Sequence, residues 1–300
     1  RGYPPAFAAA LLSVAGTLAL LMPLSIPFLV YAFITGVSMR LLSMSGVIPA
    51  IISALALIGV CIWFGKKTGC DKGGKPATAG EILAAFKEAW PALLMPIMII
   101  GGIWTGLFTP TEAAAIAVVY GVIISIFLYK DLTWRDLPEI MLKSFQTSAV
   151  VMLVIGATGC LAWLITVEQV AAQLADWVQA VAHQQWLFLL MLNVCLFLVG
   201  IFIEPLPAML LTIPLFLPVA QAFRVDLVHL GVVVTANLAI ALYTPPVGGT
   251  LFVAASLAKA GIGAITKHLI PMMTVTFIVV LIVTYIPATT KVILWLFNMR

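Results

Sequence analysis

Long apolar runs constrain the fold of this chain more than any other feature. Several runs reach about 18–20 residues, the length that an α-helix needs to cross a hydrocarbon core of roughly 30 Å. The runs are continuous rather than alternating, which favours a helical bundle over a β-barrel. Of the 300 residues, 63% are hydrophobic and 9% are charged, whereas a soluble domain is about 45–50% apolar and about 25% charged. The sequence therefore predicts an all-α polytopic membrane protein with no separate globular domain.

The polar residues give little support to an enzyme or a metalloprotein. His183, His229 and His268 are scattered, and the four cysteines form no CxxC pair. No Ser-His-Asp or HExxH arrangement is present. Residues 69–76 resemble a phosphate loop, but they lack the Ser or Thr after Lys75 and the preceding strand. We therefore expect no enzymatic activity, no cofactor, no nucleic-acid partner and no metal ion other than Na⁺.

The apolar runs predict seven crossings and one helical hairpin. The run at 186–220 is too long for one crossing and is interrupted at Gly200 and at 204–207, so we predict a hairpin that enters and leaves by one face. Residues 78–90 are predicted to form a short amphipathic helix before a crossing at 91–108. The predicted parts are 1–65 (a broken helix at 6–38 and the next crossing), 66–90 (a cytoplasmic amphipathic segment), 91–165 (scaffold-type crossings), 166–258 (the hairpin and a second broken helix at 227–258) and 259–300 (the last crossing).

The lysines and arginines predict the orientation. If the start of the chain is cytoplasmic, 11 of the 15 basic residues lie on the cytoplasmic side, as expected for an inner-membrane protein. The C-terminus is then periplasmic. The remaining basic residues, on the far side, are Arg40, Arg224, Lys291 and Arg300.

An internal repeat relates two broken helices. Residues 3–36 and 225–258 align without gaps at an offset of 222 residues, which places Pro23 on Pro245. The first copy runs outward and the second inward, so they are inverted repeats, a frequent design of secondary transporters. Carbonyl groups freed at a break can coordinate Na⁺, and positive helix starts can hold a carboxylate. The alternative is a plain proline kink at each break.

Two polar residues in apolar runs are further candidates. Glu204 is the only acid deep in such a run, and an intramembrane ionisable group is costly and often functional. Its alternative role is to satisfy backbone donors at a wet hairpin tip. Asn237 precedes the second break, where it either contributes to the site or only hydrogen-bonds between helices.

Several motifs in order along the chain resemble the large membrane subunit (DctM-like) of tripartite ATP-independent periplasmic (TRAP) transporters. The resemblance covers essentially the whole chain. The motifs are Gly2-Tyr3-Pro4-Pro5, FTPTEAAA at 108–115, the hairpin turn at 200–205, and Asn237 followed by TPPVG at 244–248.

The resemblance implies an elevator-type transporter of the ion-transporter superfamily, with symport driven by a sodium gradient. It implies a small membrane subunit (DctQ-like), a periplasmic substrate-binding protein (DctP-like) and organic anion substrates such as C4-dicarboxylates or sialic acid. The implied Na⁺ ligands are Pro23 and Ser25 at the first break and Thr244, Pro245, Val247 and Gly248 at the second. The implied substrate cavity contains Glu204, Pro205, Asn237, Gly249 and Thr250.

The chain departs from the family pattern in three ways. It resembles the family only from a point after the first inward hairpin, so an N-terminal part is expected to be missing. Leu24 stands where a second proline is usual, and Ala19 and Ala241 stand where glycine is expected. Two alternatives therefore stay open: an inactive or truncated paralogue that acts as a membrane scaffold, and a stand-alone Na⁺/anion symporter. The sequence does not identify the substrate.

Overall fold

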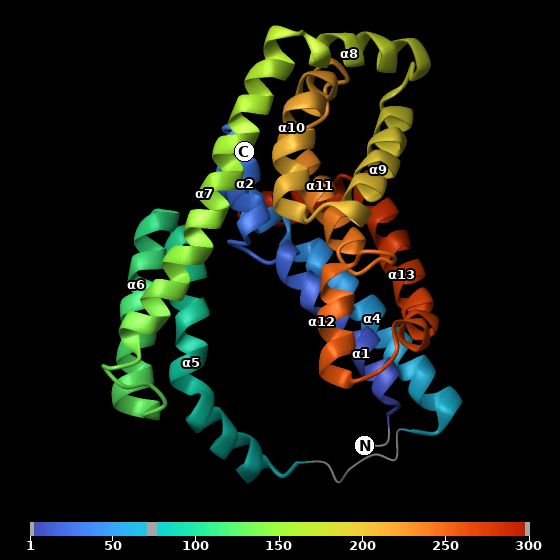
Figure 1. Ribbon diagram of the computed structural model, residues 1–300. Helices are drawn as coiled ribbons and strands as arrows, with labels where there is room; N and C mark the ends of the chain where they lie inside the picture. The colour runs from blue at the N-terminus through green and yellow to red at the C-terminus, as the bar shows by residue number, and fades with distance from the viewer. Residues whose placement is uncertain (1–2, 71–76, 298–300) are drawn as a thin grey trace. The chain divides into compact units, whose positions relative to one another are not determined.

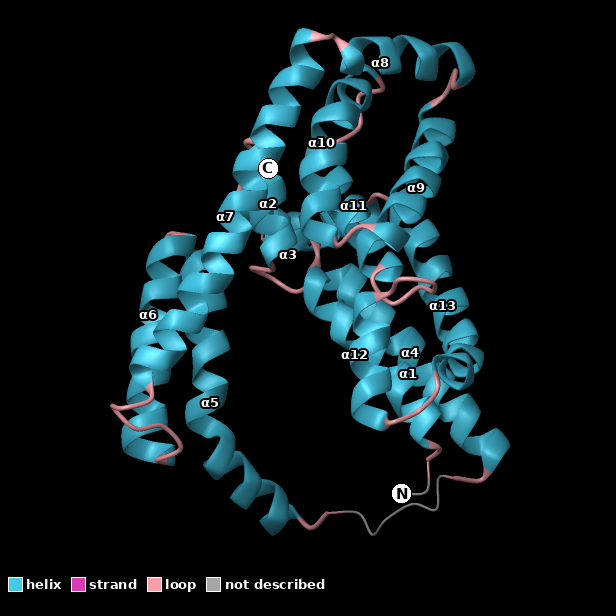
Figure 2. Cartoon of the chain, viewed as in Figure 1, coloured by secondary structure: helices cyan, strands magenta, loops and turns pink. Residues whose placement is uncertain are grey.

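The computed structural model describes residues 3–70 and 77–297, and helix is the dominant element. The chain is 83% helical, and no strand occurs in the described ranges (Figure 2). Eight helices within these ranges are long and apolar enough to cross a membrane. The predicted all-α polytopic class is confirmed. Gly2, Lys72, Lys75, Arg300 and most of the phosphate-loop-like segment lie outside the described residues.

The helices form two compact units. The larger one comprises Arg1–Lys72 and Ala157–Arg300, and the smaller one comprises 73–156. The larger unit begins with α1 (Pro5–Thr17), η1 (Leu18–Leu21), α2 (Ile26–Thr35), α3 (Met39–Ser45) and α4 (Val47–Thr68). It continues with α8 (Val170–Val181), α9 (Gln185–Phe202), α10 (Pro205–Ala222), α11 (Leu227–Ala241), α12 (Gly249–Ala258), α13 (Ile262–Tyr285) and α14 (Ala288–Leu296).

The two broken helices pair crosswise, as inverted repeats should. Adding 222 to the bounds of α1 and α2 gives 227–239 and 248–257, within two residues of α11 and α12. In space α1 packs against α12, while η1 and α2 pack against α11 (Figure 1). The first half of each copy thus meets the second half of the other, so the two copies run in opposite directions.

The predicted hairpin is formed by α9 and α10, which meet at Ile203 and Glu204. Its end lies close to α11, because a β-carbon added at Gly200 would come within 2.5 Å of the Ala241 Cβ. Glycine therefore permits the close approach of α9 to the last turn of α11. The hairpin packs on α11 together with α13, α3, η1 and α2, and all residues from His229 to Ala241 are buried.

The smaller unit contains α5 (Ala79–Thr105), α6 (Pro110–Ile123), the π-helix η2 (Ile124–Tyr129) and most of α7 (Leu137–Val167). A capping box at the start of α6 joins Thr109 and Glu112. The prediction of a separate amphipathic helix at 78–90 is wrong, because α5 runs without a break through Pro91 and Pro96.

Two tyrosines of the following segments contact α5 near Pro91. A proline removes one helical hydrogen bond and distorts those around it. The Tyr120 hydroxyl donates to the Pro91 carbonyl oxygen at 2.7 Å, and the Tyr129 hydroxyl donates to the Glu88 carbonyl oxygen at 2.9 Å. Both tyrosines therefore join α6 and η2 to α5 close to Pro91, in a helix that continues where local sequence predicts an end.

Candidate functional site

The second break, at residues 242–248, gathers oxygen atoms at the end of α11. The Thr244 hydroxyl donates to the Ile240 carbonyl oxygen at 2.8 Å. The backbone N–H and the hydroxyl of Thr250 both lie 3.3 Å from the Leu242 carbonyl oxygen, to which they donate. The negative end of the α11 dipole adds to these groups. Such a set of hydroxyl and carbonyl oxygens suits a hard cation such as Na⁺.

Gly248 is required by the shape of this break. A β-carbon there would lie 2.8 Å from the Tyr243 carbonyl carbon and 3.0 Å from the Thr244 oxygen. Real Cβ atoms essentially never approach a backbone this closely, and a backbone cannot yield as a side chain can. The Pro245–Pro246 peptide bond in the same loop is cis.

The turn of the hairpin lies beside the start of α12. A β-carbon added at Gly249 would be 4.0 Å from the Glu204 Oε1. Glu204 stands at the beginning of α10, whose first residue is the buried Pro205. The starts of α10 and α12, which are the positive ends of their helix dipoles, therefore lie near the same carboxylate. The structure thus places Glu204, with the adjacent Pro205, close to Gly249. The role of these three residues in a substrate cavity stays a prediction.

Ser13 joins this cluster from the first repeat. Its hydroxyl lies 3.1 Å from the Thr250 hydroxyl, across 237 residues of sequence. Ser13 is buried on α1, the helix that packs against α12. Ser13 was not among the predicted site residues, although its hydroxyl in an apolar run of one repeat is a signal that could have identified it.

The first break, at residues 22–25, is supported by polar groups of a different kind. The Ser25 hydroxyl accepts from the Phe28 N–H at 3.4 Å and caps α2. Leu24 has a left-handed backbone (φ 66°), and its N–H donates to the Ser43 hydroxyl at 3.4 Å. Pro23 precedes this left-handed residue. The predicted Na⁺ role of Pro23 and Ser25 stays a prediction, since here the one hydroxyl of the break already serves as a helix cap.

Asn237 lies in a buried polar network rather than at the break. Its Nδ2 donates to the Asn193 Oδ1 at 2.6 Å and to the Val233 carbonyl oxygen at 2.8 Å. Asn193 in turn donates to the Thr284 hydroxyl at 3.1 Å. Asn193 stands about three helical turns before the hairpin turn. The contacts support the interhelical reading of Asn237, and its assignment to the substrate cavity stays a prediction.

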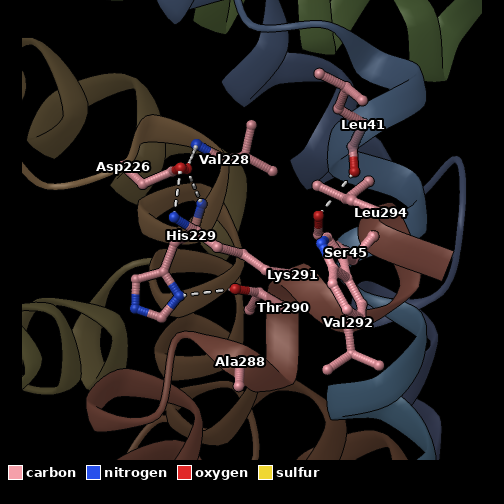
Figure 3. Close-up of a pocket in the computed structure, with 11 residues that line it drawn as sticks. Leu41, Ser45, Asp226, Val228, His229, Ala288, Thr290, Lys291, Val292 and Leu294 are labelled. Atoms are coloured by element: carbon pink, nitrogen blue, oxygen red, sulfur yellow. Dashed lines mark hydrogen bonds and ion pairs between the residues drawn. The ribbon is translucent and has the colours of Figure 1, made fainter. Parts of the chain in front are cut away.

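A pocket of about 370 Å³ lies at the opposite end of α11, and the predicted site residues do not line it (Figure 3). It is bounded by α3, the start of α11 and α14. Its polar groups are engaged with one another: the Lys291 Nζ is 3.0 Å from the Asp226 Oδ2. Its lining residues are Leu41, Ser45, Asp226, Val228, His229, Ala288, Thr290, Lys291, Val292, Leu294 and Trp295.

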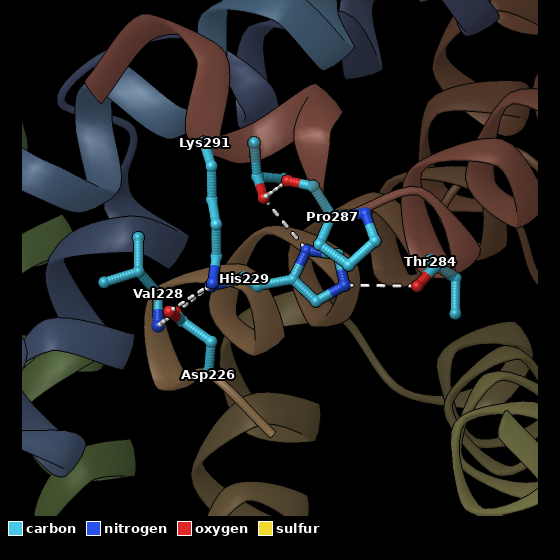
Figure 4. Close-up of polar contacts among 7 residues, drawn as sticks. Asp226, Val228, His229, Thr284, Pro287 and Lys291 are labelled. Carbon is cyan, nitrogen blue, oxygen red and sulfur yellow. Dashed lines mark hydrogen bonds and ion pairs between the residues drawn. The ribbon is translucent and has the colours of Figure 1, made fainter. Parts of the chain in front are cut away.

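The polar contacts at this pocket fix α14 to α11 (Figure 4). Asp226 caps α11 by accepting from the Val228 and His229 N–H groups. Burial alone would raise the Asp226 pKa, but these hydrogen bonds and Lys291 together bring the pKa below its ordinary value. The His229 ring lies between the Thr284 carbonyl oxygen and the Thr290 hydroxyl. These groups therefore hold the start of α11 against α14 and the end of α13.

Comparison with known proteins gives a family model and named relatives that agree on one class of transporter. The family model "Tripartite ATP-independent periplasmic transporter, DctM component" matches residues 1–289. The C4-dicarboxylate TRAP transporter large permease protein DctM of Pseudomonas aeruginosa is 36% identical over 96% of this chain and 67% of its own length. The isethionate TRAP transporter permease protein DctMQ of Oleidesulfovibrio alaskensis is 35% identical over 96% of this chain and 45% of its own length. The sialic acid TRAP transporter permease protein SiaT of Haemophilus influenzae is 36% identical over 89% of this chain and 43% of its own length.

Proposed function

Because the chain belongs to the DctM component family of tripartite ATP-independent periplasmic transporters, we propose that it is the large permease subunit of a Na⁺-coupled secondary transporter that imports small organic anions. The observation that carries the proposal is the meeting of the hairpin turn with the second break, where Glu204 lies beside Gly249. Two positive helix ends and one cluster of oxygen atoms face the same small region. The family is one of permeases rather than enzymes.

The second break is the better Na⁺ site of the two. The Thr244 hydroxyl keeps oxygen lone pairs available while it donates to Ile240. Pro245, Val247 and Gly248 form the loop of this break, and their carbonyl oxygens are the further proposed ligands. The first break, with Pro23 and Ser25, is the second proposed ion site.

The charge of Glu204 gives a physical reason for coupling. A substrate carboxylate bound at the starts of α10 and α12 is attracted by both helix dipoles but repelled by the Glu204 carboxylate. A Na⁺ ion in the adjacent break offsets this repulsion, so ion and substrate bind best together. Thr250 and, less directly, Asn237 complete the proposed cavity.

Substrate class and partners follow from the relatives. Their printed names include C4-dicarboxylate, sialic acid and isethionate transporters, whose shared chemistry is an organic anion. We take carboxylates as the first class to test. The proposed partners are a DctQ-like small membrane subunit and a DctP-like periplasmic binding protein. The proposed setting is the inner membrane, with the start of the chain cytoplasmic and the C-terminus periplasmic. The proposed mechanism is an elevator movement of a transport domain that holds the hairpin and the broken helix.

Uptake into proteoliposomes tests the proposal. Labelled organic acids are offered with and without an inward Na⁺ gradient, in the presence of the small subunit and the binding protein. The chain is compared with a version extended upstream to the length of its relatives. Uptake that needs the Na⁺ gradient supports the proposal in either version. Folded protein that takes up none of the acids in either version would favour the scaffold reading, and uptake without a binding protein would favour a stand-alone symporter.

A further inference from the structure

A groove on the outer surface of the larger unit lies between α4 and α13. It has a volume of about 440 Å³, within the usual size range of small-molecule pockets. The small side chains of Ala56 and Gly59 and the ring of Pro271 leave this space open between the two helices. The lining residues, almost wholly apolar, are Ala56, Gly59, Val60, Trp63, Pro271, Thr274 and Val275.

The two helices run in opposite directions along the groove. The Phe64 ring meets the His268 ring edge-on, with centroids 5.3 Å apart. This contact joins the last turns of α4 to the first turns of α13. Cationic residues at the end of one helix and at the start of the other therefore lie at the same end of the groove.

Two lysines continue the lining faces at that end. Lys67 lies four residues after Trp63, and Lys267 lies four residues before Pro271, so each sits one helical turn beyond the groove. The Lys67 Nζ is 4.9 Å from the centroid of the Trp63 ring, which itself lines the groove. Both lysines are exposed, and neither forms an ion pair with another residue of the described ranges.

We propose that this groove binds one anionic phospholipid. The acyl chain lies along the apolar wall, and the headgroup phosphate lies between Lys67 and Lys267. Trp63 has the amphipathic ring that is typical of the membrane–water boundary. Basic pockets between transmembrane helices are characteristic sites for anionic headgroups.

Charge complementarity favours this occupant over a neutral lipid or a protein helix. At one end, the apolar groove meets two ammonium groups that have no ion-pair partner among the described residues. This charge pattern is complementary to a lipid with an anionic head. A neutral lipid would gain little from the two lysines. An apolar helix of another protein would leave both ammonium groups without a counter-charge.

Native mass spectrometry of the purified chain in detergent tests the proposal. Phosphatidylglycerol and phosphatidylcholine with identical acyl chains are titrated separately. We expect tighter binding of phosphatidylglycerol, and a loss of about fivefold per lysine in Lys67→Gln and Lys267→Gln, since each surface lysine contributes about 1 kcal/mol to such binding. The double variant should lose about 25-fold. Lys87→Gln, an exposed lysine on α5, is the matched control and should bind as the parent does.

A second variant separates the groove from the charges. Gly59→Leu fills the groove without changing charge, so it should weaken both lipids. Equal binding of the two lipids by the parent overturns the proposal, as does unchanged phosphatidylglycerol binding by the double variant. Full competition by glycerol phosphate would assign the lysines to a free phosphate compound and would equally overturn it. Gel filtration checks that each variant stays monodisperse before lipid is added.

Discussion

The two broken helices share one design but differ in their surroundings. The first half of the second copy, α11, is buried from His229 to Ala241, whereas α1 exposes much of its surface. The hairpin α9–α10 packs on α11, and no hairpin within the described residues packs on α1 in the same way. The starts also differ, because Asp226 caps α11 with its side chain while Pro4 begins α1 with none.

The breaks differ accordingly. The second has a glycine that admits no side chain, two hydroxyls near carbonyl oxygens and an adjacent carboxylate. The first has a left-handed leucine and a hydroxyl used as a helix cap. A sequence repeat therefore fixes where a helix breaks, while the neighbours decide what the break can bind.

Exchanging the residues at one repeat position should give the largest effect. Gly248 aligns with Ile26, which is exposed. Gly248→Ile forces a side chain against the backbone of the second break, and overpacking of this kind costs about 1–3 kcal/mol. We expect Na⁺-dependent uptake to fall about tenfold or more, measured in proteoliposomes. The reverse change, Ile26→Gly, is the control and should cost less than about 1 kcal/mol of stability with uptake retained. Equal losses in both variants would show that the breaks are equivalent.

Removing the hydroxyl of the second break should weaken Na⁺ binding. Thr244→Val keeps the shape of the side chain but removes the oxygen. Interactions with a charged group are worth about 1.5 kcal/mol or more, so the half-saturating Na⁺ concentration should rise about tenfold. Met22 holds the equivalent position in the first break, and Met22→Leu should leave the Na⁺ dependence unchanged. An unaltered Na⁺ dependence in Thr244→Val would show that the Thr244 hydroxyl is not a Na⁺ ligand.

The buried amide pair should contribute to stability rather than to transport. Asn237 aligns with Ala15, which is exposed, so the pair with Asn193 is a feature of the second repeat alone. A double-mutant cycle with Asn193→Leu and Asn237→Leu should give a coupling energy of about 0.6 kcal/mol, and at most about 1.7 kcal/mol. Unfolding in detergent measures it. A coupling energy near zero, together with lost substrate affinity in Asn237→Leu, would indicate that Asn237 contributes to the substrate cavity rather than to stability.

The ion pair at the start of α11 should have the smallest effect. The folded-state pKa of Asp226 lies below its ordinary value, so its contribution is present above about pH 4 and is lost as pH falls through the lower folded pKa. Asp226→Asn keeps the helix cap and removes the charge. The side chains of Lys291 and Asp226 are 51% and 41% exposed, so we expect a loss of only about 0.5 kcal/mol near neutral pH. Unfolding at neutral and acidic pH tests this, and a difference that persists at low pH would contradict the assignment to charge.

The sequence predicted the elements that prolines and glycines delimit. Pro23, Pro245 and Glu204 interrupt apolar runs, so both breaks and the hairpin turn could be located from spacing. The continuity of α5 could not, because a proline in an apolar run is compatible with either the end of a helix or a kink within it. The contact of Ser13 with Thr250 depends on crosswise pairing, which the inverted repeat implies only once both copies are placed in space. The proposed roles of the site residues stay predictions.

The tyrosine contacts of α5 have a consequence for biosynthesis. The Pro91 carbonyl is bonded by Tyr120, 29 residues later, and the Glu88 carbonyl by Tyr129, 41 residues later. The ribosome delivers α5 before either tyrosine exists, and Pro91 leaves the Lys87 carbonyl without its helical donor, which is costly in lipid. The translocon should therefore release α5 together with α6 as a pair, and truncating the nascent chain before Tyr120 should leave α5 weakly inserted.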